Sequence, residues 1–220
     1  LQLLQRDLPE KYRDRVPYVI ASEKGPNGLV RKLYLNWLRM GVNRPLTQLE
    51  FAIQAADLLK ALHDNVGIIN LDLRLDNFVI TPKGVGFVDF GSAVRMGEDL
   101  SQSPMLKSLF DEMMSTSQIQ QVLGRMKKSG MVTSQLLRDA HQKVDKAADL
   151  FFLAFQMKRP HLNPDFKDLV SFDHKSEEAR RISLLTDAIL RPKDPNHPRF
   201  ISARDIYNGL KRIERKMADQ

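Results

Sequence analysis

Cysteine is absent from the 220 residues of this sequence. Disulfide bonds and metal sites with cysteine ligands are therefore excluded. A chain without disulfides suits a reducing compartment, and we expect a cytoplasmic location. Long apolar runs are also lacking. None approaches the roughly 18–20 residues that a transmembrane helix needs, so we expect no membrane span.

Histidine is scarce, with five residues in the chain. They form neither a His-Glu-x-x-His motif nor a pairing with a nucleophile, so the sequence does not indicate a zinc hydrolase or a catalytic triad. His63, near the end of a predicted helix, is interpreted as a packed or capping residue.

The chain is basic, with a net charge of +7 and a pI near 9.6. Basic and acidic side chains nevertheless alternate along most of it, as in residues 211–216. Such alternation is typical of solvated helix faces. We therefore do not expect nucleic acid as a partner.

The pattern of apolar residues predicts an α+β fold that is mainly α-helical. Thr47-Gln-Leu-Glu50 is a capping box, so a long buried helix should begin there and end before Gly67. Two strand-like runs, 16–21 and 29–35, flank the turn signal of residues 25–28 and should form a hairpin.

Further elements follow from the same patterns. The predicted helices cover 1–12 with a break at Pro9, 146–157, 176–191 and a last helix capped by Ser202; two more strands cover 78–80 and 85–88.

The most informative segment of the chain runs from residue 70 to residue 91. It reads Asn-Leu-Asp-Leu-Arg-Leu-Asp-Asn over residues 70–77 and Asp-Phe-Gly over residues 89–91. Asp72, Asn77 and Asp89 are thus spaced as in sites of phosphoryl transfer. The pattern resembles the protein-kinase signature, in which His-Arg-Asp-Leu-x-x-x-Asn precedes Asp-Phe-Gly.

The resemblance to protein kinases implies a role for each matching residue. Asp72 would be the catalytic base, and Arg74 would neutralise charge on the transferring phosphoryl group. Asn77 and Asp89 would bind Mg²⁺, and ATP would be the phosphoryl donor. Asp149, on the helix predicted at 146–157, would anchor the backbone of the catalytic loop.

The resemblance also implies where the adenine ring of ATP would bind. Val79 would lie under the ring. The linker between the two lobes would supply backbone amides from four consecutive residues, Leu35, Asn36, Trp37 and Leu38.

The implied fold is a protein-kinase-like C-lobe with a short β-hairpin remnant of the N-lobe. Residues 1–38 would form the partial N-lobe and the hinge, and residues 39–220 the C-lobe, with a helical insert or activation segment at about 92–143. The sequence begins at Leu1 and has no glycine-rich phosphate loop or strand lysine before the hinge. We therefore expect a fragment that is inactive by itself.

Three functions remain open at this point. The first is a divergent protein kinase that phosphorylates a protein hydroxyl. The second is a catalytically inactive pseudokinase or adaptor that binds a protein partner, favoured by Asn70 and Leu71 in place of His-Arg. The third is a small-molecule phosphotransferase, favoured by the unusual segment after Gly91.

Overall fold

The computed structural model describes residues 2–24, 30–35, 38, 41, 44–97, 146–158, 166, 168–190 and 202–219. Within these residues the chain has an α+β fold, in which about half of the residues lie in helices and the sheets are small and two-stranded. This confirms the fold class at that level.

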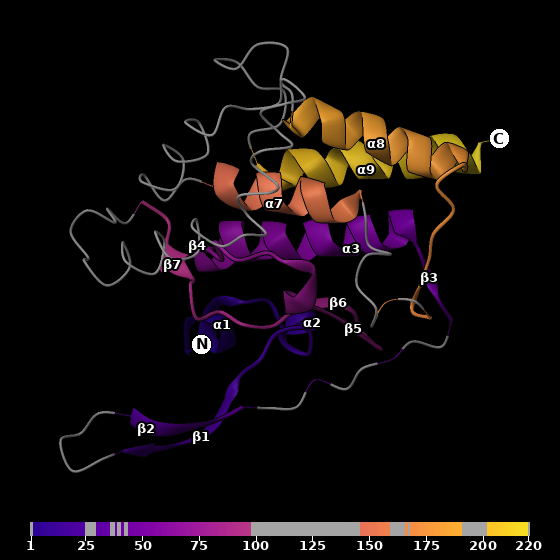
Figure 1. Cartoon of the computed structure of the whole chain (residues 1–220). Coiled ribbons are helices and arrows are strands. Elements are labelled where there is room, and N and C mark those ends of the chain that lie inside the picture. The colour runs from indigo at the N-terminus through magenta and orange to yellow at the C-terminus, as the bar shows by residue number, and fades with distance from the viewer. Residues whose placement is uncertain are drawn as a thin grey trace, which may run out of the picture.

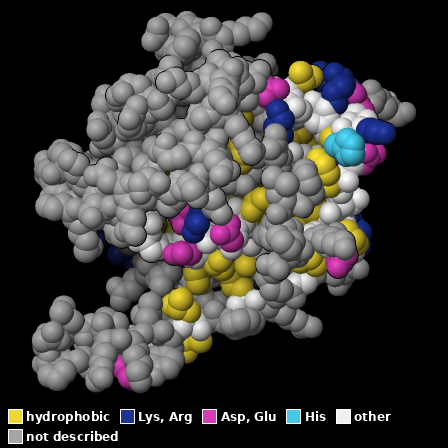
Figure 2. Space-filling model, viewed as in Figure 1, with side chains coloured by type: hydrophobic (Ala, Val, Ile, Leu, Met, Phe, Trp, Pro, Cys, Tyr) yellow, Lys and Arg dark blue, Asp and Glu magenta, His cyan; other side chains and the backbone are white. Residues whose placement is uncertain are grey.

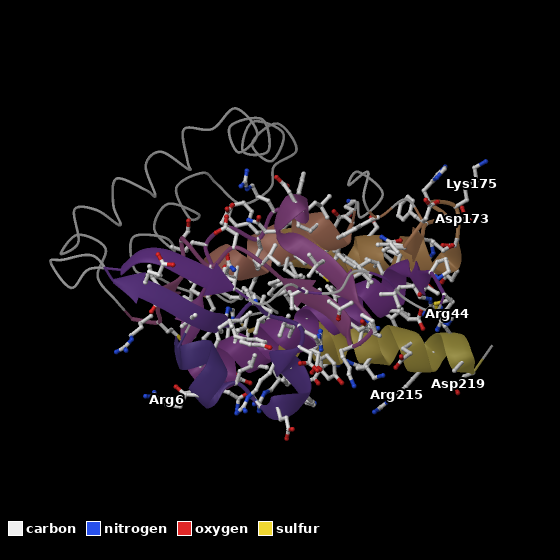
Figure 3. The ribbon with its side chains drawn as sticks, turned by 90° about the horizontal axis from the view of Figure 1, so that it is seen from below. Arg6, Arg44, Asp173, Lys175, Arg215 and Asp219 are labelled. Atoms are coloured by element: carbon white, nitrogen blue, oxygen red, sulfur yellow. The ribbon has the colours of Figure 1, made fainter. Side chains whose placement is uncertain are left out.

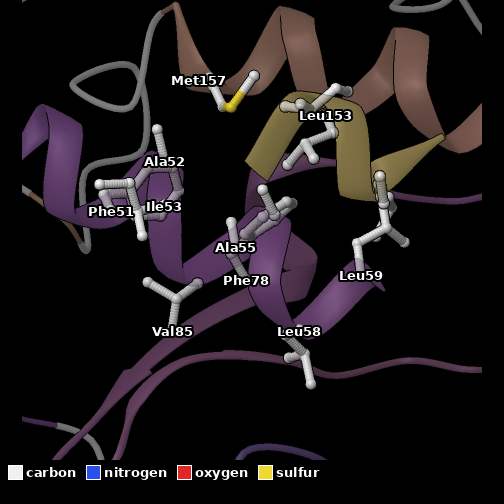
Figure 4. Packing of buried hydrophobic residues seen from close by; sticks show 14 of the residues in the cluster. Phe51, Ala52, Ile53, Ala55, Leu58, Leu59, Phe78, Val85, Leu153 and Met157 are labelled. Atoms are coloured by element: carbon white, nitrogen blue, oxygen red, sulfur yellow. The ribbon is translucent and has the colours of Figure 1, made fainter. Parts of the chain in front are cut away.

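Helix α3 (Gln48–Ala61) forms the centre of the molecule (Figure 1). The predicted capping box is present, because the Thr47 side chain accepts from the Glu50 amide and the Glu50 carboxylate accepts from the Thr47 amide. The helix is apolar around most of its circumference (Figure 4), and it continues as a π-helical turn, η1 (Leu62–Val66), which ends at Gly67. A helix buried on several sides must be covered on each of them.

Three helices cover one side of α3. They are α7 (Ala147–Met157), α8 (Glu177–Leu190) and α9 (Ala203–Ala218), and each packs against α3 (Figure 1). The Ser202 hydroxyl accepts from the Asp205 amide, which confirms the predicted cap of the last helix.

The opposite side of α3 is covered by the hairpin of β5 (Phe78–Thr81) and β6 (Gly84–Phe87) and by the N-terminal segment. That segment contains α1 (Gln2–Asp7) and α2 (Glu10–Arg13), separated at Pro9 as predicted. The chain entering and leaving β5–β6 carries Asp72, Arg74, Asn77 and Asp89, so this side of α3 determines the placement of these four predicted site residues.

Aromatic rings fill the space between α3 and the β5–β6 hairpin. The ring centroid of Phe51 on α3 lies 5.7 Å from that of Phe78 and 5.6 Å from that of Phe166, and Phe78 stacks edge-on against Phe87 at 4.9 Å. All four side chains are almost fully buried. These contacts fix the hairpin against the central helix.

The hairpin predicted near the N-terminus is present, as β1 (Val19–Lys24) paired antiparallel with β2 (Val30–Leu35). Its first strand begins three residues later than the predicted run of 16–21. Val16 packs into the core instead, and Pro17 has no amide hydrogen to donate to a strand. The turn signal at 25–28 lies outside the described residues.

Two pairs of very short strands complete the described fold. β3 (Leu46–Thr47) pairs in parallel with β8 (Val170–Ser171), and β4 (Ile68–Ile69) pairs antiparallel with β7 (Val94–Arg95). β7 lies at the start of the segment predicted at about 92–143 as a helical insert or activation segment. The remaining part of that segment, from residue 98, lies outside the described residues.

Charged side chains of both signs lie next to one another on the described surface (Figure 2). Arg44, Asp173 and Arg215 are among those at the periphery (Figure 3), and Arg44 forms an ion pair with Glu50. Among the residues described, no helix combines the length and hydrophobicity that crossing a bilayer requires.

Candidate active site

The carboxylate of Asp149 on α7 organises the start of the predicted catalytic loop. Its Oδ2 accepts from the amide of Asn70 and its Oδ1 from the amide of Leu71, both at 2.9 Å. His63 Nε2 lies 2.9 Å from the same Oδ2. Asp149 is fully buried, so these partners replace the water that its carboxylate loses. The arrangement matches the anchoring role expected of Asp149, and His63 is a packed residue as predicted.

Asp72, the predicted base, follows directly and is held from several sides. Its amide donates to Asn70 Oδ1 at 3.0 Å. Its Oδ1 accepts from Arg74 Nε at 2.7 Å, and its Oδ2 accepts from Asn77 Nδ2 at 3.0 Å. The structure thus brings together three of the predicted site residues within one hydrogen-bond network.

Arg74 lies among three carboxylates. Its partial burial acts to lower the pKa of the guanidinium, but the charges of Asp72, Asp76 and Asp89 together outweigh burial and raise the pKa above its ordinary value. Arg74 therefore stays cationic at any physiological pH.

Asp89 lies just beyond β6, at the surface of the molecule. Its backbone adopts the left-handed conformation, with φ of 58°, which is uncommon for a residue other than glycine. Its Oδ1 accepts from the amide of Gly91 at 3.0 Å. One residue earlier, the amide of Val88 donates to the carbonyl oxygen of Asn77 at 2.8 Å, so the two predicted metal ligands are joined through the backbone.

The oxygen atoms of Asn77 and Asp89 suit Mg²⁺. Among the described residues, Asn77 Nδ2 donates to the carbonyl and carboxylate oxygens of Asp72, so Oδ1 is the side-chain atom of Asn77 that could bind a metal ion. Asp89 supplies a carboxylate in an exposed position. Mg²⁺ prefers such hard oxygen ligands and commonly takes only one or two from the protein.

The residues predicted around adenine are only partly described. Val79 is half-buried in the middle of β5. The next residue, Ile80, accepts at its carbonyl oxygen from the amide of Gly41 at 2.9 Å, so Gly41, three residues after the predicted hinge, lies beside β5. Leu35 ends β2 and is exposed, and Leu38 is half-buried. Asn36 and Trp37 lie outside the described residues.

Two features of the site were not predicted from the sequence. The side chain of Asn70 is nearly fully buried and supports Asp72, although the sequence indicates only that it replaces a histidine of the kinase signature. Arg15, far away in sequence, contacts the strand that leads to Asp89. The glycines of β6 were the available signal for it, because glycine in a strand often marks a close backbone approach.

Two of the described residues near this loop have buried polar side-chain atoms without a hydrogen-bond partner. Among the described residues, three buried side-chain atoms lack a hydrogen-bond partner, and two of them, His63 Nδ1 and Asn70 Nδ2, belong to residues that contact the Asp149 carboxylate through other atoms. Buried polar groups are normally satisfied, and exceptions are concentrated at functional or strained positions.

Comparison with known proteins adds no relative to this picture. No protein-family model matches the chain, and no curated protein matches it.

Proposed function

We propose that this chain is the C-lobe, with a small part of the N-lobe, of a divergent protein kinase that transfers the γ-phosphoryl group of ATP to a protein hydroxyl. One observation carries the proposal. A buried carboxylate, Asp149, binds the backbone just before Asp72, and Asp72 then meets both Arg74 and Asn77. Such a network holds a base in one orientation.

Each residue would contribute a separate part of the reaction. The acceptor oxygen would form a bond to the γ-phosphorus while the bond from that phosphorus to ADP breaks, and Asp72 would accept the proton of the acceptor hydroxyl. Arg74 would stabilise the negative charge of the phosphoryl group from one side. Mg²⁺ held by Asn77 and Asp89 would neutralise charge on the nucleotide phosphates.

A phosphoryl-transfer assay on the full-length protein tests the proposal. The protein is incubated with labelled ATP and Mg²⁺, once with protein acceptors and once with small hydroxyl compounds. Changing Asp72→Asn should reduce transfer about 10²–10⁴-fold, because the proton acceptor is lost. Asp89→Asn should reduce it through weaker Mg²⁺ binding.

Asp76→Asn is the matched control. Asp76 belongs to the same loop, but its side chain is exposed and lies 3.8 Å from Arg74. The variant should keep most of the activity of the wild type. Equal transfer by wild type and Asp72→Asn would sink the proposal.

Two other outcomes would identify the alternatives. Nucleotide-dependent thermal stabilisation without transfer to any acceptor would indicate a pseudokinase or adaptor. Transfer to small hydroxyl compounds alone would indicate a small-molecule phosphotransferase.

A further inference from the structure

Arg15, between α2 and β1, is a cationic side chain in an unusual place. Only 5% of its surface is exposed. Its guanidinium donates through Nη2 to the carbonyl oxygen of Gln54 on α3 at 2.6 Å and through Nε to that of Val85 on β6 at 2.7 Å. Burial lowers its pKa to about 10, against the raising influence of Asp57 and Tyr12. Arg15 therefore remains charged at neutral pH, and its two hydrogen bonds compensate for the loss of water around the guanidinium.

The outer edge of β6 is occupied by Arg15 and Gln54. The other edge pairs with β5. On the outer edge, the carbonyl oxygen of Arg15 accepts from the Phe87 amide at 3.0 Å, and Gln54 Oε1 accepts from the Val85 amide at 3.0 Å. β6 has four residues, and Arg15 and Gln54 supply on its outer edge the hydrogen bonds that a third strand would supply.

The fit between Arg15 and β6 is close. A Cβ atom added to Gly86 would lie 2.4 Å from the carbonyl oxygen of Arg15, far below any normal contact. Only glycine allows the two backbones to approach in this way. The strand is therefore held laterally as well as by its hydrogen bonds.

We propose that Arg15 is a positioning residue for Asp89, because it fixes the strand that ends two residues before that carboxylate. The inference rests on the proposed function in one respect, the role of Asp89 as a metal ligand. Catalytic groups need placement within about 0.5 Å, and a two-stranded hairpin alone is only marginally stable. Arg15 connects this hairpin to the central helix α3, and so links the position of the N-terminal segment to that of Asp89, just beyond β6.

Amide hydrogen exchange of the full-length protein without nucleotide provides the first test. In Arg15→Met, the carbonyl oxygens of Gln54 and Val85 lose the hydrogen bonds from the guanidinium, and the Phe87 and Val88 amides should exchange on the order of tenfold faster. Arg15→Lys should give an intermediate increase, because an ammonium cannot reproduce the forked geometry. If Arg15→Met does not fold, the exchange rates of Arg15→Lys provide the test instead.

Tyr12→Phe is the matched control for loss of anchoring. The Tyr12 hydroxyl donates to Asp57 Oδ2 on α3 at 2.8 Å, so this residue also fixes the N-terminal segment, but its hydrogen bond does not involve β6. The exchange rates of Phe87 and Val88 should remain those of the wild type. Equal acceleration in Tyr12→Phe and Arg15→Lys would overturn the inference.

The Mg²⁺ dependence of phosphoryl transfer provides the second test. Arg15→Lys should require several-fold more Mg²⁺ for half-maximal rate, whereas Tyr12→Phe should not. An active wild type with the same Mg²⁺ dependence in both variants would refute the role toward Asp89 and leave the proposed function intact. An inactive wild type would refute the proposed function, and hydrogen exchange would still decide whether Arg15 fixes the segment leading to Asp89.

Discussion

The carboxylate of Asp149 accepts hydrogen bonds from the backbone amides of Asn70 and Leu71, although Asp149 lies 79 residues further along the chain than Asn70. Leu71 has a φ of 64°, a conformation that leucine rarely adopts. The hydrogen bond from the Leu71 amide to Asp149 Oδ1 helps to hold the backbone in this strained conformation. The loop that carries Asp72 is therefore shaped by a distant helix rather than by its own sequence.

Replacing Asp149 should damage both the fold and the site. In Asp149→Ala, two buried amides and His63 lose their acceptor, and we expect a loss of about 3 kcal/mol in the free energy of unfolding. Denaturant unfolding monitored by circular dichroism measures it. If the proposed function holds, phosphoryl transfer should fall as well, because the backbone of Leu71 next to Asp72 is no longer held.

Asp187→Ala is the control for this change. Asp187, on α8, forms an ion pair with Lys158 at 2.9 Å near the surface, and such pairs contribute about 0–1 kcal/mol. A loss in Asp149→Ala no larger than in Asp187→Ala would contradict the anchoring role.

Gly86→Ala should be strongly destabilising for a single methyl group. The new Cβ would lie 2.4 Å from the Arg15 carbonyl oxygen and 3.0 Å from Val79 Cγ2, so β6 must move away from both. We expect a cost of about 1–3 kcal/mol, measured by thermal unfolding. Gly67→Ala offers a comparison, because Gly67 has open space around it and a φ of 69°, and its cost of about 1 kcal/mol comes from backbone conformation alone.

The two glycine variants should also differ in their rescue. Asn tolerates left-handed backbone, so Gly67→Asn should be more stable than Gly67→Ala, whereas Gly86→Asn should be no better than Gly86→Ala. Rescue of position 86 by Asn would show that steric contact with Arg15 is not the cause.

Arg74→Lys tests whether the forked geometry of the guanidinium matters. Arg74 donates to Asp72 through Nε at 2.7 Å and through Nη2 at 3.3 Å, and a lysine can satisfy only one of these oxygens. If the proposed function holds, kcat should fall about tenfold with little change in unfolding free energy. An unchanged kcat would mean that a point charge is sufficient at this position.

The sequence was most predictive where the signal is local. The capping box at Thr47 and the cap at Ser202 determine helix starts by short-range hydrogen bonds, and both are present. The spacing of Asp72 and Asn77 also brings the two side chains together through one turn, η2 (Leu75–Asn77). Local patterns of this kind carry their geometry with them.

Contacts between distant segments could not be predicted in the same way. Arg15 stands among other charged residues, and nothing in its neighbourhood distinguishes a buried arginine from a solvated one. The pairing of β4 with β7 involves two residues on each strand, which is too short for any periodicity. The start of β1 was predicted too early, because Val16 was counted as a strand residue although its side chain is buried in the core before the strand begins.

The hydrogen bonds around Asp57 should make the free energy of unfolding depend on pH in the acidic range. Burial acts to raise the pKa of Asp57, but hydrogen bonds from Lys60 and Tyr12 outweigh it, so the pKa in the folded state lies below its ordinary value of 3.8. A lowered carboxyl pKa contributes stability above the unfolded value, and that contribution disappears as the pH falls through the folded value. The difference in unfolding free energy between wild type and Asp57→Asn should therefore be largest above pH 4 and should shrink below it. Chemical denaturation between pH 6 and pH 2 measures this difference, and a difference that stays constant over the range would show that the charge of Asp57 contributes nothing to the contact between α2 and α3.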